Sequence, residues 1–150
     1  MTHTYAHLLY HFVWSTKERI PLIRDSFEHR LYEFIRSIAM NRKARIITIN
    51  GMPDHIHMLT SLHVTTSIPE FVRDIKIGST KWLNKDVADC KGFAWQEGYG
   101  VFSVGQYGQD KVISYIENQK IHHKDKSFED EYLSFLDALG IVYDPRFVLD

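Results

Sequence analysis

Alternating apolar positions near the start of the chain predict a β-strand over residues 5–15. Successive side chains of a strand point to opposite faces, so one face of this segment is formed by Leu8, Tyr10, Phe12 and Trp14. Three further strands are predicted over residues 45–49, 55–62 and 99–104. Between the first two of these, Asn50-Gly51 and Pro53-Asp54 are typical turn residues.

Apolar residues spaced by three and four positions predict helices over residues 26–41, 67–84, 109–122 and 128–140. Side chains that can cap a helix precede the first two, namely Asp25 or Ser26 and Thr66 or Ser67. The resulting order, βαββαβ followed by a helix, predicts a ferredoxin-like α+β fold. Such a fold has one antiparallel sheet with two helices on one face.

Length and composition indicate one ordinary globular domain spanning residues 1–150, with 44% apolar and 25% charged residues. The net charge of -1 argues against unspecific binding to polyanions, so any nucleic-acid contact requires a local patch. Cys90 has no second cysteine to pair with. The chain shows no signal peptide and no apolar run near the ~20 residues of a membrane span. We therefore expect a cytoplasmic protein that does not enter the membrane.

The segment Met52 to Leu59 contains a histidine pair separated by one apolar residue. On a strand, His55 and His57 share one face, while Ile56 and Met58 face the other way. Two imidazoles that point together can hold one metal ion, and the apolar residues can anchor the strand in a core. A pair of this kind is also compatible with histidines that are merely exposed or hydrogen-bonded, so the pattern alone leaves both interpretations open.

Tyr115 and Gln119 lie one turn apart on the predicted helix 109–122. At about 100° per residue, four polar residues fall within about 60° of Tyr115, and Ile113 points to the far side. These four are Lys111, Asn118, Gln119 and His122. Tyr115 alone would be interpreted as a packing residue, but a polar stripe around a tyrosine is typical of a face that meets a charged ligand. Together with the histidine pair, it indicates metal-assisted attack on a phosphodiester.

Basic side chains follow the first strand and line the second helix, where they are either solvated or in contact with phosphates. The candidate DNA contacts are His11, Lys17, Arg19, Arg73, Lys76, Lys111 and His122.

Four segments, in order along the chain, resemble the HUH transposases of single-stranded insertion sequences, which use one catalytic tyrosine. They are His11–Lys17, Met52–Leu59, Trp95–Val104 and Val112–Gln119, the last followed by His122-His123. Enzymes associated with repetitive extragenic palindromes (REPs) share the same core. Residues 1–150 are thus expected to form a single HUH transposase domain.

The resemblance implies that Tyr115 is the nucleophile and that His55, His57 and Gln119 bind a divalent metal, Mg²⁺ or Mn²⁺. Tyrosine attack would leave a 5′-phosphotyrosine and a free 3′-hydroxyl, which a second 3′-hydroxyl can reverse without ATP. The implied substrate is single-stranded DNA with hairpins. The implied assembly is a homodimer in which the tyrosine helix of one subunit serves the histidines of the other. Residues 105–108 depart from the family pattern and place a second tyrosine, Tyr107, before the helix.

Other functions remain compatible with the residues. A non-catalytic ferredoxin-like module that binds nucleic acid would place stacking aromatics on its central strands. Here the first strand has such aromatics, but the third carries histidines. A small metal-binding or sensor domain is a second alternative. A domesticated REP-associated nuclease, which cleaves without supporting transposition, is a third.

Overall fold

The computed structural model describes residues 3–88, 90–122 and 125–150, with His122 described in its backbone only. The strands are β1 (Leu9–Ser15), β2 (Arg45–Met52), β3 (His55–Ser61) and β4 (Gly100–Val104). The α-helices are α1 (Glu28–Asn41), α2 (Ile68–Asp86), α3 (Gln109–Glu117), α4 (Gln119–His122) and α5 (Phe128–Ala138). Two 3-10 turns, η1 (Lys17–Arg19) and η2 (Gln106–Gly108), precede α1 and α3. None of the helices in these described ranges is long and apolar enough to cross a membrane.

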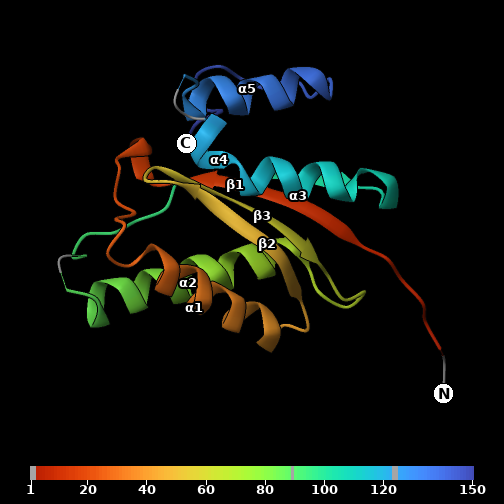
Figure 1. Ribbon diagram of the computed structural model, residues 1–150, viewed down its shortest axis with the longest axis horizontal. Coiled ribbons are helices and arrows are strands. Elements are labelled where there is room, and N and C mark those ends of the chain that lie inside the picture. Colours follow the sequence, from red (N-terminus) through yellow and green to blue (C-terminus); the bar gives the residue numbers. More distant parts are fainter. Residues whose placement is uncertain (1–2, 89, 123–124) are drawn as a thin grey trace.

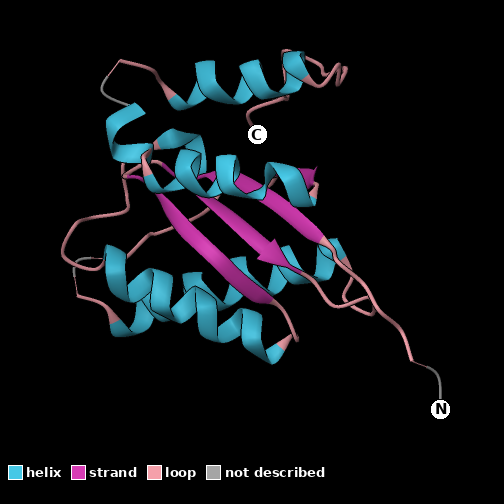
Figure 2. Cartoon of the chain, turned by 45° about the vertical axis from the view of Figure 1, so that its right-hand side comes forward, coloured by secondary structure: helices cyan, strands magenta, loops and turns pink. Residues whose placement is uncertain are grey.

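The four strands form one antiparallel sheet in the order β2-β3-β1-β4. The predicted α+β fold with a βαββαβ order is therefore confirmed. Helices α1 and α2 cover one face of the sheet, and α3, α4 and α5 lie over the other (Figures 1 and 2). Strand β3 occupies the interior of the sheet, between β2 and β1, so ladders of backbone hydrogen bonds hold it from both sides.

The side chains of β3 alternate between the two faces, as its sequence predicts. Ile56 and Met58 are fully buried in the main core with Phe12 and Trp14 of β1, against α1 and α2. Leu59 packs on the opposite face, in a smaller cluster with Ile116 of α3. This second face is the one to which His55 and His57 belong.

The helix predicted over residues 109–122 is interrupted at Asn118, whose backbone (φ −96°, ψ 15°) is not helical. The Asn50 side chain of β2 donates from Nδ2 to the carbonyl oxygens of Ile116 and Glu117, at 3.1 and 3.2 Å. It thereby satisfies carbonyls that the end of α3 leaves without an intrahelical partner. A single-helix prediction misses this break, because its cause is a side chain about 70 positions away in sequence. The predicted polar stripe is accordingly split, with Lys111 exposed and Gln119 buried.

The N-terminus of α2 follows the prediction, since Ser67 accepts a hydrogen bond from the backbone of Glu70. The start of α1 does not. Phe27, which is buried, occupies the cap position without a side-chain hydrogen bond, so neither Asp25 nor Ser26 caps this helix. Burial of the Phe27 ring in the core sets where the chain enters α1.

Gly51 lies at the end of the β2–β3 hairpin, opposite Ile56. A Cβ at this position would lie 2.1 Å from the backbone oxygen of His55. Gly51→Ala should therefore lower the free energy of unfolding by about 1–3 kcal/mol, the range typical of overpacking. Urea unfolding measures the change. Gly105→Ala is the control, because its Cβ would have no neighbour within 4 Å; equal stability of the two variants would contradict the expectation.

Candidate functional site

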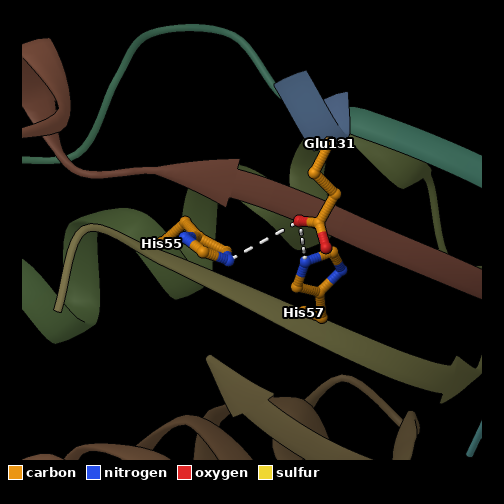
Figure 3. Close-up of side chains that lie close together, drawn as sticks. All are labelled: His55, His57 and Glu131. Carbon is orange, nitrogen blue, oxygen red and sulfur yellow. Dashed lines mark hydrogen bonds and ion pairs between the residues drawn. The ribbon is translucent and has the colours of Figure 1, made fainter. Parts of the chain in front are cut away.

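The site lies on the face of the sheet that α3, α4 and α5 cover, and its centre is formed by His55 and His57. Both side chains are fully buried. Glu131 from the first turn of α5 points down between them (Figure 3). These three residues each offer a ligand atom, and the ligand atoms all lie within 4.8 Å of one another.

His57 is held by partners at both ring nitrogens. Its Nδ1 lies 2.8 Å from Nε2 of His11 on β1, and its Nε2 lies 2.7 Å from Oε1 of Glu131. The pKa of His11 is lowered to about 3, mainly by burial and to a lesser extent by the neighbouring His57. The charge of Glu131 opposes this shift. His11 is therefore neutral near pH 7 and can either donate to His57 or accept from it. When His11 accepts, His57 presents a lone pair on Nε2, the form that binds metal.

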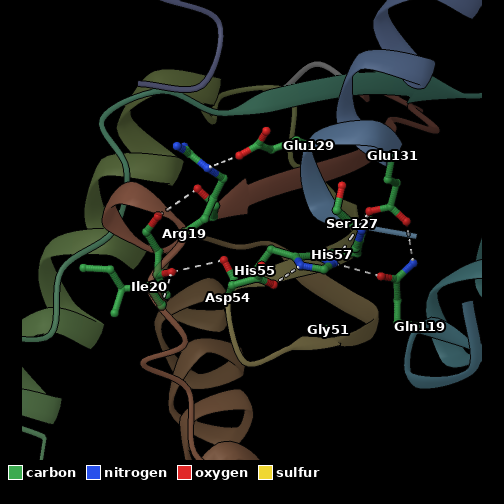
Figure 4. Close-up of polar contacts among 12 residues, drawn as sticks. Arg19, Ile20, Gly51, Asp54, His55, His57, Gln119, Ser127, Glu129 and Glu131 are labelled. Carbon is green, nitrogen blue, oxygen red and sulfur yellow. Dashed lines mark hydrogen bonds and ion pairs between the residues drawn. The ribbon is translucent and has the colours of Figure 1, made fainter. Parts of the chain in front are cut away.

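His55 also has a partner at each ring nitrogen. Its Nδ1 lies 2.7 Å from Oδ1 of Asp54, a contact that orients the ring. The Nε2 atom faces Oε1 of Gln119 at 3.0 Å (Figure 4). The amide nitrogen of Gln119 donates to Oε2 of Glu131 at 3.2 Å, which fixes the orientation of the amide group.

Nε2 of His55 and Oε1 of Gln119 lie 3.0 Å apart, a separation at which a proton or a cation can lie between them. The same corner contains Oε1 of Glu131, 3.6 Å from Nε2 of His55. Two imidazoles, a carboxylate and an amide oxygen are a ligand set that suits a divalent ion, and Asp54 and His11 hold the outer ring nitrogens in place. The residues present therefore fit the metal that the sequence predicts.

Glu131 was not predicted as a site residue. It belongs to a run of acidic residues, Glu129 to Glu131, that is usually a solvated helix face. A signal was nevertheless present, because Glu131 is three positions after Phe128 and one before Tyr132, on the apolar stripe of α5. An acidic residue within an apolar stripe indicates a buried carboxylate that requires a partner.

Tyr115 lies over the histidines of its own chain. Its ring centroid is 5.7 Å from that of His57, and its hydroxyl donates to Oε2 of Glu131. Burial, the hydrogen bond to Glu131 and the charge of Glu131 together raise the pKa of Tyr115, and a hydrogen bond with Gln119 only partly offsets them. The hydroxyl is thus fully protonated at neutral pH. Tyr107, by contrast, is 98% exposed.

The predicted DNA contacts are not in one place. Lys17 is exposed on η1, and Lys111 is exposed on α3. Arg19, also on η1, donates to Glu129 of α5 at 2.9 Å and to the carbonyl of Leu149 at 3.1 Å. Arg73 lies on α2, on the sheet face opposite the site.

Two more of the predicted contacts also have partners inside the protein. His11 is buried beside His57. The Lys76 ammonium donates to the carbonyls of residues 96, 97 and 98, at 2.8, 3.1 and 2.7 Å, which accounts for its three N–H groups. Burial lowers the pKa of Lys76 to about 8. The side chain of His122 lies outside the described part of the structure.

Comparison with known proteins gives a consistent result. The family model described as "Transposase IS200 like" matches residues 4–119. The ISDra2 transposase TnpA of Deinococcus radiodurans is 29% identical over 117 residues, covering 75% of this chain and 84% of that protein. The transposase for insertion sequence element IS200 of Salmonella typhimurium is 27% identical over 124 residues, covering 79% and 81%.

Two solved structures are also similar. One is a Deinococcus radiodurans R1 protein described as a candidate transposase, with a TM-score of 0.60, 27% identity and coverage of 79% of this chain and 95% of that chain. The other is a REP-associated tyrosine transposase bound to a REP hairpin, with a TM-score of 0.62 and coverage of 82% and 74%. At 16% identity, the second similarity concerns the fold alone.

His57→Ala should weaken Mn²⁺ binding at least about 100-fold, because it removes one imidazole and also detaches Glu131 and His11 from their partner. Gln119→Ala should have a smaller effect, since an amide is a weaker ligand and water can replace it. Isothermal titration with Mn²⁺ measures both. The control is His63→Ala, an exposed histidine bonded to Thr65. Wild-type affinity in His57→Ala would disprove the metal site.

Proposed function

Because the chain belongs to the family of IS200-like transposases, we propose that it cleaves and rejoins single-stranded DNA through a covalent link to Tyr115. The observation that carries this proposal is the position of the Glu131 carboxylate. One of its oxygens accepts a hydrogen bond from the Tyr115 hydroxyl, and the other faces His57. A nucleophile is thereby held beside a set of metal ligands, as phosphodiester cleavage requires.

Each residue has a defined task in this proposal. Glu131 and Gln119 orient the Tyr115 hydroxyl. His55, His57 and Gln119 hold Mg²⁺ or Mn²⁺. The bound ion would supply positive charge for the phosphate oxygens and offset the charge that develops during attack.

In the cleavage step, the Tyr115 oxygen forms a bond to phosphorus and the bond to the 3′-oxygen breaks. The products are a 5′-phosphotyrosine and a free 3′-hydroxyl. The tyrosine must lose its proton as it attacks, because its raised pKa keeps it neutral beforehand. The bond energy is retained in the adduct, so attack by another 3′-hydroxyl rejoins the strand without ATP.

The proposed substrate is a single strand marked by hairpins. A strand that reaches the half-buried Tyr115 needs an exposed, bendable backbone, and one relative of the same fold is bound to a REP hairpin. Lys17 and Arg19 on η1 and Lys111 on α3 remain the proposed phosphate contacts. His11 is left out because it is buried beside His57, and Lys76 because three carbonyls accept from its ammonium group.

Tyr115→Phe removes one hydroxyl and should abolish the covalent adduct with a labelled, hairpin-bearing single strand in Mn²⁺. Denaturing electrophoresis detects the adduct. The control Tyr107→Phe changes an exposed ring and should leave adduct formation intact. An adduct with Tyr115→Phe would rule out this nucleophile, and a wild-type chain that binds the strand without any adduct would favour a non-catalytic binding module. Cleavage without rejoining would favour the domesticated nuclease.

We further infer that Tyr115 serves the histidines of its own chain, in place of the exchange between subunits that the family resemblance implies for the homodimer. Two tethers support this arrangement. Asn50 donates to the last carbonyls of α3, and Lys120 of α4 donates to the carbonyl of Gly51 at 2.7 Å and to Glu28 at 2.9 Å. The first tether fastens the end of the tyrosine helix to β2, and the second fastens α4 to β2 and to α1.

Mixing Tyr115→Phe with His57→Ala chains tests this assignment. If each chain completes its own site, every site in a mixed dimer carries one defect and adduct formation stays absent. If the tyrosine helices are exchanged, one site of each mixed dimer has no defect and cleavage returns. The two variants are co-expressed with different tags, so that tandem purification isolates mixed dimers. Recovered cleavage in that fraction would refute assembly within one chain.

A further inference from the structure

Helix α5 lies beyond the segment that the family model matches, which ends at Gln119. It nevertheless brings Glu131 into the centre of the site, where the side chain is almost completely buried. The family similarity therefore accounts for the histidines, Tyr115 and Gln119, and it leaves the carboxylate among them without an assigned role.

The two oxygens of Glu131 face different partners. Oε1 lies 2.7 Å from Nε2 of His57 and 3.6 Å from Nε2 of His55. Oε2 accepts from the Tyr115 hydroxyl and from the amide nitrogen of Gln119. One oxygen thus points toward the nitrogens that would bind the ion (Figure 3). The other oxygen accepts from the nucleophile.

Packing of α5 sets this position of the carboxylate. Ser127 caps the helix by accepting from the backbone of Asp130 at 3.2 Å. Phe128, Tyr132 and Leu136 are buried against Val13 of β1, on the same face of the sheet as the histidines. The Phe128 ring lies 4.8 Å from that of His55, so α5 rests directly on the site.

We propose that Glu131 is an anionic ligand of the ion bound by His55 and His57, and that metal binding is thereby coupled to the docking of α5 over Tyr115. The inference rests on the proposed function and adds a ligand to its metal site. A carboxylate buried among imidazoles is strongly stabilised by a cation next to its oxygen. Because Glu131 reaches the ion only when α5 is docked, the ion must also stabilise the docked helix.

Glu131→Gln tests the proposal, because it keeps the shape of the side chain and removes its charge. The matched control is Glu129→Gln, two residues earlier on α5, where the side chain is half exposed and bonded to Arg19. Isothermal titration of the full chain with Mn²⁺, in the absence of DNA, should show a loss of affinity of roughly 10–100-fold for Glu131→Gln. The control should stay within about threefold of wild type, as expected for an exposed charge.

Hydrogen exchange of the α5 amides provides a second measurement. Mn²⁺ should slow exchange across Phe128–Ala138 in the wild-type and Glu129→Gln chains, and this protection should be lost in Glu131→Gln. If Glu131→Gln does not fold, the wild-type comparison with and without Mn²⁺ still decides. Wild-type Mn²⁺ affinity in Glu131→Gln, or Mn²⁺ binding that leaves α5 exchange unchanged, would overturn the proposal. The Tyr115 adduct assay reports on the proposed function separately, and it can succeed where this inference fails.

Discussion

Burial of the Glu131 carboxylate is the constraint on which the site depends. An ionised carboxylate is costly to remove from water unless donors or a cation surround it. Here the surrounding groups come from three separate elements: His57 on β3, Tyr115 on α3 and Gln119 on α4. The carboxylate contacts the groups that also form the chemical site, so the packing of α5 and the geometry of the nucleophile cannot be changed independently.

The interior position of β3 makes it a rigid base for this arrangement. Ile56 and Met58 are fixed in the main core, so the alternate residues His55 and His57 have little freedom on the other face. The neighbouring strand β2 then contributes Asn50, which ends α3 and lets the chain turn before Gln119. Gln119 follows this break, and its amide oxygen lies 3.0 Å from Nε2 of His55.

The segment shared with the IS200-like family contains the sheet, the histidine pair, Tyr115 and Gln119. Helix α5 adds a negative charge to a site that would otherwise consist of neutral ligands. A carboxylate strengthens binding of a hard divalent cation relative to imidazole and amide alone. Glu129 of the same helix forms an ion pair with Arg19, one of the proposed phosphate contacts. The C-terminal helix therefore contacts both the centre of the site and the edge at which DNA is proposed to bind.

Local periodicity predicts four strands along the chain and the two faces of β3, because alternation over 55–62 directly reports which side chains share a side. It ends the second strand too early, since Asn50 and Gly51, predicted as turn residues, are paired with β3. The roles of His55 and His57 as metal ligands and of Tyr115 as nucleophile are implied by the resemblance to a family. The structure brings the three residues together. Three features required the tertiary structure: the break at Asn118, the engagement of Lys76 by three carbonyls, and the arrival of Glu131. Each depends on a partner distant in sequence, either a side chain that satisfies backbone carbonyls or a helix that packs across the sheet. Contacts of this kind leave no period in the sequence, and only the folded chain decides them.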